Sequence, residues 1–330
     1  MCTNLRMRAE DGSIVVGRTM EFAADLGWEL LIAPAGNAFT GTAPGGPGHR
    51  WTTDHGFVGV SALGRQIVTD GMNDAGLFAG LLYLPGLASY ELADDAADRM
   101  ISPDETAALV LGTAATVTEA IATIEGVVVW NRVEEQLAGV LPVHLVLHDR
   151  SGDFAVIEWI DGVRTVHRSP VGVCTNNPAY PWHLTNLQNY VNLSATNVAP
   201  VALDGEAIAP LGQGSGLLGL PGDWTPPSRF VRAAAISAAT FPAADGPGAV
   251  VATLHMLNTF DIPLGLVRGN EGNELTQWVS VSDLANSTYL LRTYADPTPR
   301  QVRLADAGLD TGPLRTVGLP SDPTPPVLVV

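Results

Sequence analysis

Lysine is absent from this 330-residue chain, so all 17 basic residues are arginines, and they face 34 acidic residues. The resulting formal net charge of −17 repels phosphate backbones and anionic lipid surfaces. We therefore expect neither a nucleic acid nor a membrane as partner.

Cysteine and long apolar runs are scarce as well. Cys2 and Cys174 are the only cysteines, too few for a disulfide framework. The first twenty residues lack the apolar stretch of a signal peptide. The most apolar segment, residues 76–90, is broken by Pro85 and is shorter than the roughly 20 residues of a membrane span. These absences predict a soluble, cytoplasmic protein.

Hydrophobic residues make up 46% of the chain and form blocks of one structural type. Alternating apolar patterns predict strands at 13–22, 28–34, 56–63, 143–168 and 276–295, with a tight turn at 149–153 and a loop at 41–50. Helices are expected at 104–124, 228–240 and 250–260. Blocks rather than strict alternation favour layered α+β architecture. With no dividing linker, we expect one domain over 1–330 that ends in an extended, Pro-rich tail at 317–330.

The position of Cys2 raises a chemical possibility. If Met1 is removed, the thiol and a free α-amine sit on one residue. Their reference pKa values, about 8.5 and about 7.7–8.0, are close enough for the amine to act as the base of the thiol. By itself, "MC" favours the plainer interpretation, a cysteine without a role at a frayed chain end.

Several longer motifs accompany this cysteine: "GRTMEF", "DGMNDAGL", "TNNPAYPWHLTNLQNY" and "LGQGSGLLGLPGDWTPPSRFVRAA". With "MCT", they resemble the choloylglycine hydrolase family, which contains bile salt hydrolases and penicillin V acylases of the N-terminal-nucleophile (Ntn) superfamily. The resemblance extends over nearly the whole chain. It implies a four-layer αββα sandwich, hydrolysis of a linear amide C–N bond in a small acylated substrate, and no cofactor. It also implies a homotetramer, with residues 183–213 as an oligomerisation loop.

The resemblance assigns roles to individual residues. Cys2 matches the nucleophile, and Arg18 matches an arginine beside the thiol, where a cation favours the ionised sulfur. Glu21 stands where the family usually has Asp, a carboxylate that holds the α-amine. Asn176 matches the amide that binds the oxyanion, and Arg229 matches a motif arginine near the site.

Three of these residues have plainer alternatives. Arg18 could be a surface strand residue, and Arg229 could form an ion pair with Asp223 at a helix start. Asn177 is the neighbouring amide, and its plainer interpretation is a turn residue before Pro178.

Tyr83 bears on the substrate. It falls where bile salt hydrolases carry Asn and penicillin V acylases commonly carry Tyr, and its backbone N–H would be the second oxyanion donor. Its ring favours acyl groups with an aromatic or flat apolar surface. The order of preference is phenoxyacetyl-type penicillins, conjugated bile salts, then N-acyl homoserine lactones. The alternative is a catalytically silent relative that only binds acylated small molecules, which Glu21 and a retained Met1 would favour.

Other features receive structural interpretations. His144 and His148 are expected to be exposed strand residues rather than a metal pair. The Gly-rich segment 211–222 does not fit the phosphate-binding motifs and is predicted to be a flexible loop. Cys174 is expected to fill the core on the same side as Asn176, with a lesser possibility that it resolves oxidised Cys2 as a disulfide.

Overall fold

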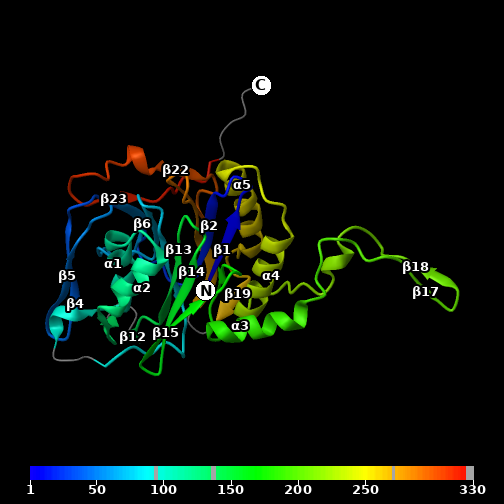
Figure 1. Ribbon diagram of the computed structural model, residues 1–330, viewed down its shortest axis with the longest axis horizontal. Helices are drawn as coiled ribbons and strands as arrows, with labels where there is room; N and C mark the ends of the chain where they lie inside the picture. Colours follow the sequence, from blue (N-terminus) through cyan, green and yellow to red (C-terminus); the bar gives the residue numbers. More distant parts are fainter. Residues whose placement is uncertain (93–95, 135–138, 270–271, 325–330) are drawn as a thin grey trace.

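Two large sheets lie face to face and helices cover the outer side of each, in the computed structural model of residues 1–92, 96–134, 139–269 and 272–324 (Figure 1). The first sheet has the order β16–β1–β2–β20–β21–β22, with β19 also paired to β20. Its strands within the described ranges are β1 (Cys2–Arg8), β2 (Ile14–Phe22), β16 (Val173–Cys174), β19 (Val267–Gly269), β20 (Gly272–Asp283), β21 (Thr288–Thr293) and β22 (Arg300–Arg303).

The second sheet has the order β15–β14–β13–β8–β7–β6–β3–β23, and every pair in it is antiparallel. Its strands are β3 (Glu29–Ala33), β6 (Phe57–Ser61), β7 (Asp70–Asn73), β8 (Phe78–Tyr83), β13 (Val143–His148), β14 (Phe154–Ile160), β15 (Val163–Arg168) and β23 (Arg315–Gly318). Two-stranded pairs complete the described strands: β4 (Ala38–Ala43) with β5 (Gly46–Thr52), β9 (Met100–Ile101) with β10 (Val128–Val129), β11 (Val133–Glu134) with β12 (Gly139–Val140), and β17 (Val201–Leu203) with β18 (Glu206–Ile208).

The α-helices form the two outer layers. They are α1 (Thr106–Thr113), α2 (Val117–Glu125), α3 (Tyr180–Leu187), α4 (Pro226–Ala239) and α5 (Gly246–Leu257). Helices α4 and α5 contact β1, β2, β16 and β20, whereas α1 and α2 contact β7, β8 and β13. Because β1 also contacts β8 and β20 contacts β7, the sheets pack on each other. The layers run helix, sheet, sheet, helix, which is the α+β sandwich of Ntn type that the resemblance implies.

Burial on both faces explains the sequence of the central strands. In β6, Val58 and Val60 belong to the core between the sheets, whereas Phe57 belongs to the core under α1. Neighbouring side chains of a strand point to opposite faces, so a strand between two cores needs apolar residues at both parities. Gly17 of β2 permits close approach of α5, since a Cβ there would lie 2.5 Å from Thr253 Cγ2.

Most of the expected elements are present, with two corrections. The segment 41–50 is not a loop: it contains the β4–β5 hairpin, in which Ala43 pairs with Gly46. Pro44 and Gly45 make the turn, and Gly45 has a φ of 79°, the geometry of a Pro-Gly type II turn. The expected helix 104–124 is interrupted between α1 and α2, where Ala114 is extended.

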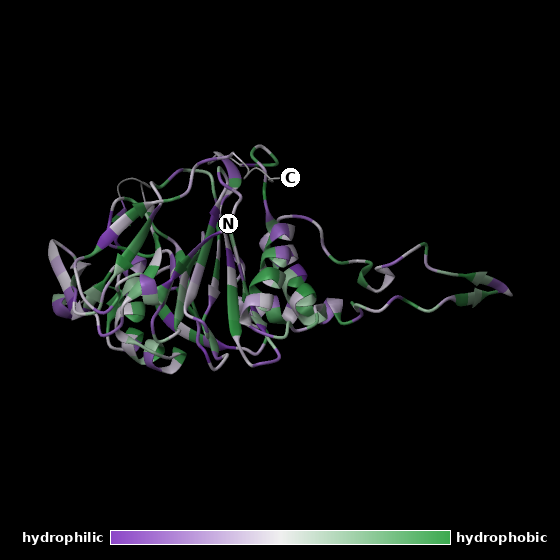
Figure 2. Cartoon of the chain, turned by 90° about the horizontal axis from the view of Figure 1, so that it is seen from above, coloured by the Kyte–Doolittle hydropathy of each residue, from purple (hydrophilic) through white to green (hydrophobic). Residues whose placement is uncertain are grey.

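An arm, defined here as residues 191–223, leaves the sandwich between α3 and α4 and ends in the β17–β18 hairpin. The outer part of the arm, with this hairpin, stands clear of the body in both views (Figures 1 and 2). Val201, Leu203 and Ile208 of the hairpin are exposed. Val317 and Gly318, the start of the expected C-terminal tail, pair with β3, and residues 325–330 of that tail lie outside the described residues. No helix in the described part of the chain is long and apolar enough to cross a membrane.

Candidate active site

Cys2 begins β1, and its thiol faces the space between the two sheets. The residue is only 2% exposed. Its Sγ lies 3.4 Å from Nη2 of Arg18 and 3.8 Å from Sδ of Met20. In the β1–β2 register Cys2 is opposite Met20 and Asn4 is opposite Arg18, so these side chains share one face. Arg18 is therefore a buried neighbour of the thiol and not a surface residue.

The second sheet holds the guanidinium of Arg18 in place. Nη2 donates to the carbonyl oxygen of Leu81 at 2.7 Å, and Nη1 donates to that of Thr69. The carboxylate of Asp70 lies 3.8 Å from Nη1, and the ring centre of Trp278 lies 4.8 Å from the guanidinium carbon. Backbone and side-chain acceptors thus fix this cation beside Cys2.

Asp70 is the buried counter-charge of Arg18. Burial raises the pKa of Asp70, while Arg18 and the hydroxyl of Tyr289, which donates at 2.6 Å, oppose that rise. Sequence reasoning quoted "DGMNDAGL" but did not single out its first residue. The signal was a carboxylate at the start of a short strand between apolar segments, where an unpaired charge is rarely tolerated.

The backbone of Met1 continues the strand pairing of β1 up to Glu21. The N–H of Glu21 donates to the Met1 carbonyl oxygen at 2.9 Å, and the Met1 amine donates to the Glu21 carbonyl oxygen. The amine also lies 3.3 Å from Oε2 of Glu274, a second carboxylate that sequence reasoning missed. The Met1 amine therefore meets the backbone of Glu21 and the side chain of Glu274.

The carboxyl group of Glu21 is fully buried. Its Oε1 accepts a hydrogen bond from Thr276 Oγ1 at 3.2 Å, and its Oε2 has no partner in the described part of the chain. Burial raises the pKa of Glu21, whereas Arg229 and the terminal amine lower it. A β-bulge between Met20 and Glu21 changes the pairing with β20 at this point.

Asn176 binds Cys2 and Tyr83 through opposite ends of its amide. Its Oδ1 accepts the Cys2 N–H at 2.9 Å, and its Nδ2 donates to the carbonyl oxygen of Tyr83 at 2.6 Å. Arg229, fully buried on α4, donates to the same Oδ1 at 2.5 Å, to Thr3 Oγ1 at 2.8 Å and to the Cys2 carbonyl oxygen. The structure thus brings Asn176, Tyr83 and Arg229 together at the start of β1.

The plainer alternatives for two residues do not fit this geometry. Asp223 accepts hydrogen bonds from Thr225 and Ser228, whereas Arg229 Nε donates to the Trp224 carbonyl oxygen at 2.9 Å. Asn177 is turned away from Cys2, because its Nδ2 donates to the Pro85 carbonyl oxygen at 2.5 Å.

Tyr83 ends β8 with its backbone directed toward this cluster. The next residue, Leu84, donates its N–H to Pro142, so by the alternation of an antiparallel ladder the polar backbone groups of Tyr83 point away from β13. Its ring packs edge-on against Phe22, with centroids 5.6 Å apart.

An apolar cavity of about 40 Å³ adjoins the thiol. Aromatic rings of Phe22, Trp28 and Tyr83 line it together with aliphatic side chains. The lining is Cys2, Met20, Phe22, Leu26, Trp28, Ala62, Leu63, Ile67, Thr69, Leu81, Tyr83, Asp104, Leu141 and Val143. Asp104, the one carboxylate of this lining, is paired with Arg65 and Arg132.

The expectation that His144 and His148 are exposed is wrong. They are 1% and 0% exposed, because β13 lies between β8 and β14 and is covered on both faces. His148 Nε2 lies 2.7 Å from Asn4 Oδ1, and His144 contacts Glu158 and the segment before Asn176. Among the residues that the structure describes, no group of three or more His, Cys, Asp or Glu side chains could hold a metal ion.

Cys174 is buried and pairs opposite Asn4, two residues along β1 from Cys2. Diagonal neighbours in adjacent strands have Cα atoms about 7–8 Å apart, beyond the about 7 Å that a disulfide can span. The register therefore contradicts the idea that Cys174 resolves oxidised Cys2.

Known proteins share this architecture over almost the entire chain. The bile salt hydrolase/transferase of Clostridium perfringens (strain 13 / Type A) is 28% identical over 322 residues, covering 96% of both chains. The crystal structure of the R18L variant of conjugated bile acid hydrolase from Clostridium perfringens superposes with a TM-score of 0.88 at 25% identity, covering 98% of this chain and 99% of that one. Penicillin V acylase from Agrobacterium tumefaciens superposes with a TM-score of 0.78 at 25% identity, covering 97% and 92%.

The family model of linear amide C–N hydrolases, choloylglycine hydrolase family, matches residues 2–326 and so begins at the cysteine around which these contacts are built. With a buried cysteine at the start of an Ntn-type sandwich, the chain belongs to the choloylglycine hydrolase family of linear amide C–N hydrolases.

Proposed function

We propose that this hydrolase acts on linear amides with a flat, apolar acyl group, after removal of Met1 exposes Cys2 as the N-terminal residue. The observation that carries the proposal is the place of the Cys2 thiol, which lies between the guanidinium of Arg18 and a narrow cavity with aromatic walls. A nucleophile, a cation and an apolar recess meet at one sulfur atom.

The chemistry follows from the groups around that atom. The α-amine of Cys2 takes the thiol proton, and the sulfur attacks the amide carbonyl carbon to form a C–S bond and an oxyanion. The α-ammonium then gives the proton to the leaving amine as the C–N bond breaks, which leaves a thioester. Water, activated by the same amine, attacks the thioester and releases the carboxylic acid with the thiol restored.

Charged neighbours would support the first step. Arg18 is held within 3.4 Å of the sulfur by backbone carbonyls, so it can stabilise the thiolate without rearrangement. Glu21 has a buried Oε2 that lacks a hydrogen-bond partner among the described residues while Met1 is present. We propose that the α-ammonium of processed Cys2 is stabilised by this carboxylate, with the second acid, Glu274, nearby.

The oxyanion would be bound by Asn176 and Tyr83. The Asn176 amide nitrogen carries two hydrogens, one of which is given to the Tyr83 carbonyl oxygen, so the other is left for an oxyanion. Arg229 and the Cys2 N–H both bind Oδ1 and thereby fix which end of the amide faces the substrate. The backbone N–H of Tyr83 is proposed as the second donor.

The lining of the cavity favours acyl groups with a flat, apolar surface. The aromatic side chains of Phe22, Trp28 and Tyr83 offer flat surfaces to an aryl group. We therefore rank phenoxyacetyl amides such as penicillin V first, conjugated bile salts second and N-acyl homoserine lactones third.

A substrate panel with a mass measurement tests this proposal. Intact mass establishes whether Met1 is lost, and amine release is measured for the three substrate classes. We expect processed protein to hydrolyse penicillin V fastest, whereas Cys2→Ala and a variant whose Cys2 is kept internal by an N-terminal extension should be inactive but equally stable. Activity of the extended variant would refute the α-amine as base. Processed, folded protein with no amidase activity on any of the three would favour a silent binder.

We further propose that the arm joins copies of this chain, up to the expected tetramer. A two-stranded hairpin is marginally stable alone in water, yet the arm carries the exposed side chains of Val201 and Leu203 at its end. Burial of these side chains by another copy would stabilise both the hairpin and the assembly. The cytoplasmic location stays a prediction from the sequence.

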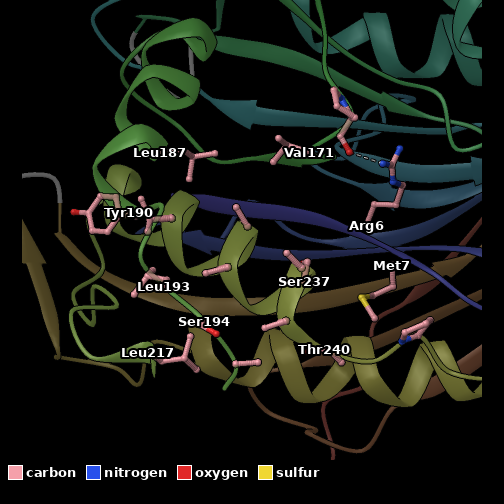
Figure 3. Close-up of a pocket in the computed structure, with 18 of the residues that line it drawn as sticks. Arg6, Met7, Val171, Leu187, Tyr190, Leu193, Ser194, Leu217, Ser237 and Thr240 are labelled. Atoms are coloured by element: carbon pink, nitrogen blue, oxygen red, sulfur yellow. Dashed lines mark hydrogen bonds between the residues drawn. The ribbon is translucent and has the colours of Figure 1, made fainter. Parts of the chain in front are cut away.

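A groove of about 790 Å³ at the base of the arm is the proposed receiving surface. Figure 3 shows Leu187, Tyr190 and Leu193 along one side of it, and along another Ser237 of α4 and Thr240, which follows this helix. Light scattering tests the proposal. Wild type should be larger than a monomer, the hairpin substitution L203D should give monomers, and V163D, at an exposed site on β15 outside the arm, should leave the size unchanged. A monomeric wild type would contradict it.

A further inference from the structure

The segment that carries Asn176 has little regular structure of its own. Strand β16 ends at Cys174 and helix α3 begins at Tyr180, so the residues between them lack a strand ladder. Buried backbone carbonyls need hydrogen-bond partners. Thr175 is 0% exposed and Asn176 is 3% exposed, so side chains must supply the partners that a ladder would otherwise provide.

Two buried histidines supply them, one on each side of Asn176. His144 Nε2, on β13, lies 3.1 Å from the carbonyl oxygen of Thr175. His183 Nε2, on α3, lies 2.9 Å from the carbonyl oxygen of Asn176 itself. Successive peptide carbonyls are thus held by rings that come from opposite ends of the site, and neither histidine has a role in the proposed chemistry.

His144 is held in its charged form by its contacts. Its Nδ1 lies 3.2 Å from Glu158 Oε1 and its Nε2 faces the Thr175 carbonyl oxygen, so both ring nitrogens meet acceptors and both must carry hydrogen. Burial by itself lowers the pKa of His144, but Cys174 and Glu158 raise it to about 10. His183 is the nearby titratable group on α3.

Glu158 ties the two ends of the segment together. Besides His144, its carboxylate accepts the N–H of Tyr180, at 3.0 and 3.1 Å to its two oxygens, and lies 3.2 Å from Nε2 of His167. Burial by itself raises the pKa of Glu158, but the hydrogen bonds from His144 and His167 lower it to about 2. One buried carboxylate therefore anchors both His144 and the first residue of α3.

His183 acts as a neutral donor. Burial lowers its pKa, and its Nδ1 has no partner within the described ranges, so the hydrogen sits on Nε2 and points at Asn176. Its ring stacks on Phe230 with centroids 4.6 Å apart, which fixes the ring plane.

We propose that His144 and His183 are positioning residues, which clamp the backbone around Asn176 and so set the distance between its amide and the Cys2 sulfur. The inference rests on the proposed role of Asn176 as oxyanion donor. A clamp is needed because an oxyanion donor stabilises the transition state only when it is already in place, and a shift of about 1 Å can lower the rate by about 10²-fold.

Paired substitutions at His183 separate the hydrogen bond from the ring. In H183F the stacking on Phe230 can persist but the donor to Asn176 is lost, so kcat should fall about tenfold or more with KM nearly unchanged. H183Q keeps an N–H that can reach the carbonyl oxygen, so it should recover most of kcat. Equal kcat in H183F, H183Q and wild type, with all three folded, would overturn the role of His183.

His148 provides the matched control for His144. Both are buried on β13, four residues apart, but His148 Nε2 contacts Asn4 Oδ1, whereas His144 Nε2 contacts the Thr175 carbonyl oxygen. H144Q and H148Q should both lower the melting temperature, whereas only H144Q should lower kcat. If kcat is unchanged in H144Q, or falls equally in the two variants, the histidine is structural only.

A double substitution distinguishes failure of the clamp from failure of the proposed function. If His183 acts through Asn176, H183F should cause no further loss of kcat in an N176A background. Full activity of N176A would refute the oxyanion role itself. An impaired N176A, together with a further additive loss on adding H183F, would leave the proposed function intact and refute the clamp.

Discussion

Replacing Arg229 by lysine tests whether the active site needs a fork of donors or only a positive charge. Arg229 Nε donates to the Trp224 carbonyl oxygen at 2.9 Å, Nη1 to Thr3 Oγ1 at 2.8 Å and to the Cys2 carbonyl oxygen, and Nη2 to Asn176 Oδ1 at 2.5 Å. Lysine keeps the charge but presents all its donors from one nitrogen. It cannot reach acceptors that lie around the whole guanidinium.

The expected loss of stability follows from these contacts. At least two buried acceptors lose a hydrogen bond to a charged donor, each worth about 1.5–3 kcal/mol, so R229K should lose about 3–6 kcal/mol. An unfolding entropy of about 2.1 cal/mol/K per residue gives about 0.7 kcal/mol/K for 330 residues. The melting temperature should therefore fall by about 4–9 °C.

The expected loss of activity follows from Asn176. Its Oδ1 keeps the Cys2 N–H but loses the guanidinium, so the amide is held by one anchor fewer. We expect kcat to fall by about 10- to 100-fold, with a small change in KM. The assay is steady-state amine release, together with calorimetry on the same preparations.

Arg232, three residues further along α4, is the control. It is 5% exposed, donates to the carbonyl oxygens of Pro221 and Asp223 and lies over the Phe260 ring, away from Cys2. R232K should lose stability but keep kcat. If R229K keeps both the wild-type kcat and the wild-type melting temperature, the hydrogen-bond geometry assigned to Arg229 is wrong.

Three further outcomes are expected. Burial raises the folded-state pKa of Glu21 above its ordinary value, so the free energy of unfolding should decline as pH rises through the acid range and Glu21 ionises. E21Q should flatten that decline and lower kcat. An unchanged kcat in E21Q would remove Glu21 from the site. His144 has a folded-state pKa of about 10 against an ordinary value of 6.5, so its stabilising effect is complete below about pH 6.5 and is lost as pH rises through 10. Urea titrations should show this decline in the free energy of unfolding in wild type and a weaker decline in H144Q. Parallel pH profiles of the two proteins would contradict the buried imidazolium. After matched peroxide exposure, C174A and wild type should regain amidase activity equally with dithiothreitol, and mass spectrometry should find no Cys2–Cys174 disulfide. Poorer recovery of activity in C174A would contradict the β1–β16 register.

The sequence determined the family, the order of the main elements and several of the residues that meet at Cys2. Local patterns sufficed for the strands, because apolar runs such as β2 and β6 are bounded by turn residues. The resemblance of the motifs to the family predicted that Arg18, Asn176 and Arg229 lie near Cys2. A family resemblance can do this because it relates residues that are far apart in the chain. The local pattern predicted a loop at 41–50, and this prediction was wrong, because Pro44-Gly45 forms the turn of a hairpin.

Only the tertiary structure decided which charges are buried and what they face. Exposure of His144 depends on the position of β13 in the sheet and on the layers above and below it, which no local pattern encodes. The pairing of Asp70 with Arg18, and of Glu158 with His144, likewise joins residues that are far apart in sequence. A buried charge is stable only with its partner in place, so the electrostatics of this site exist only once the two sheets have packed.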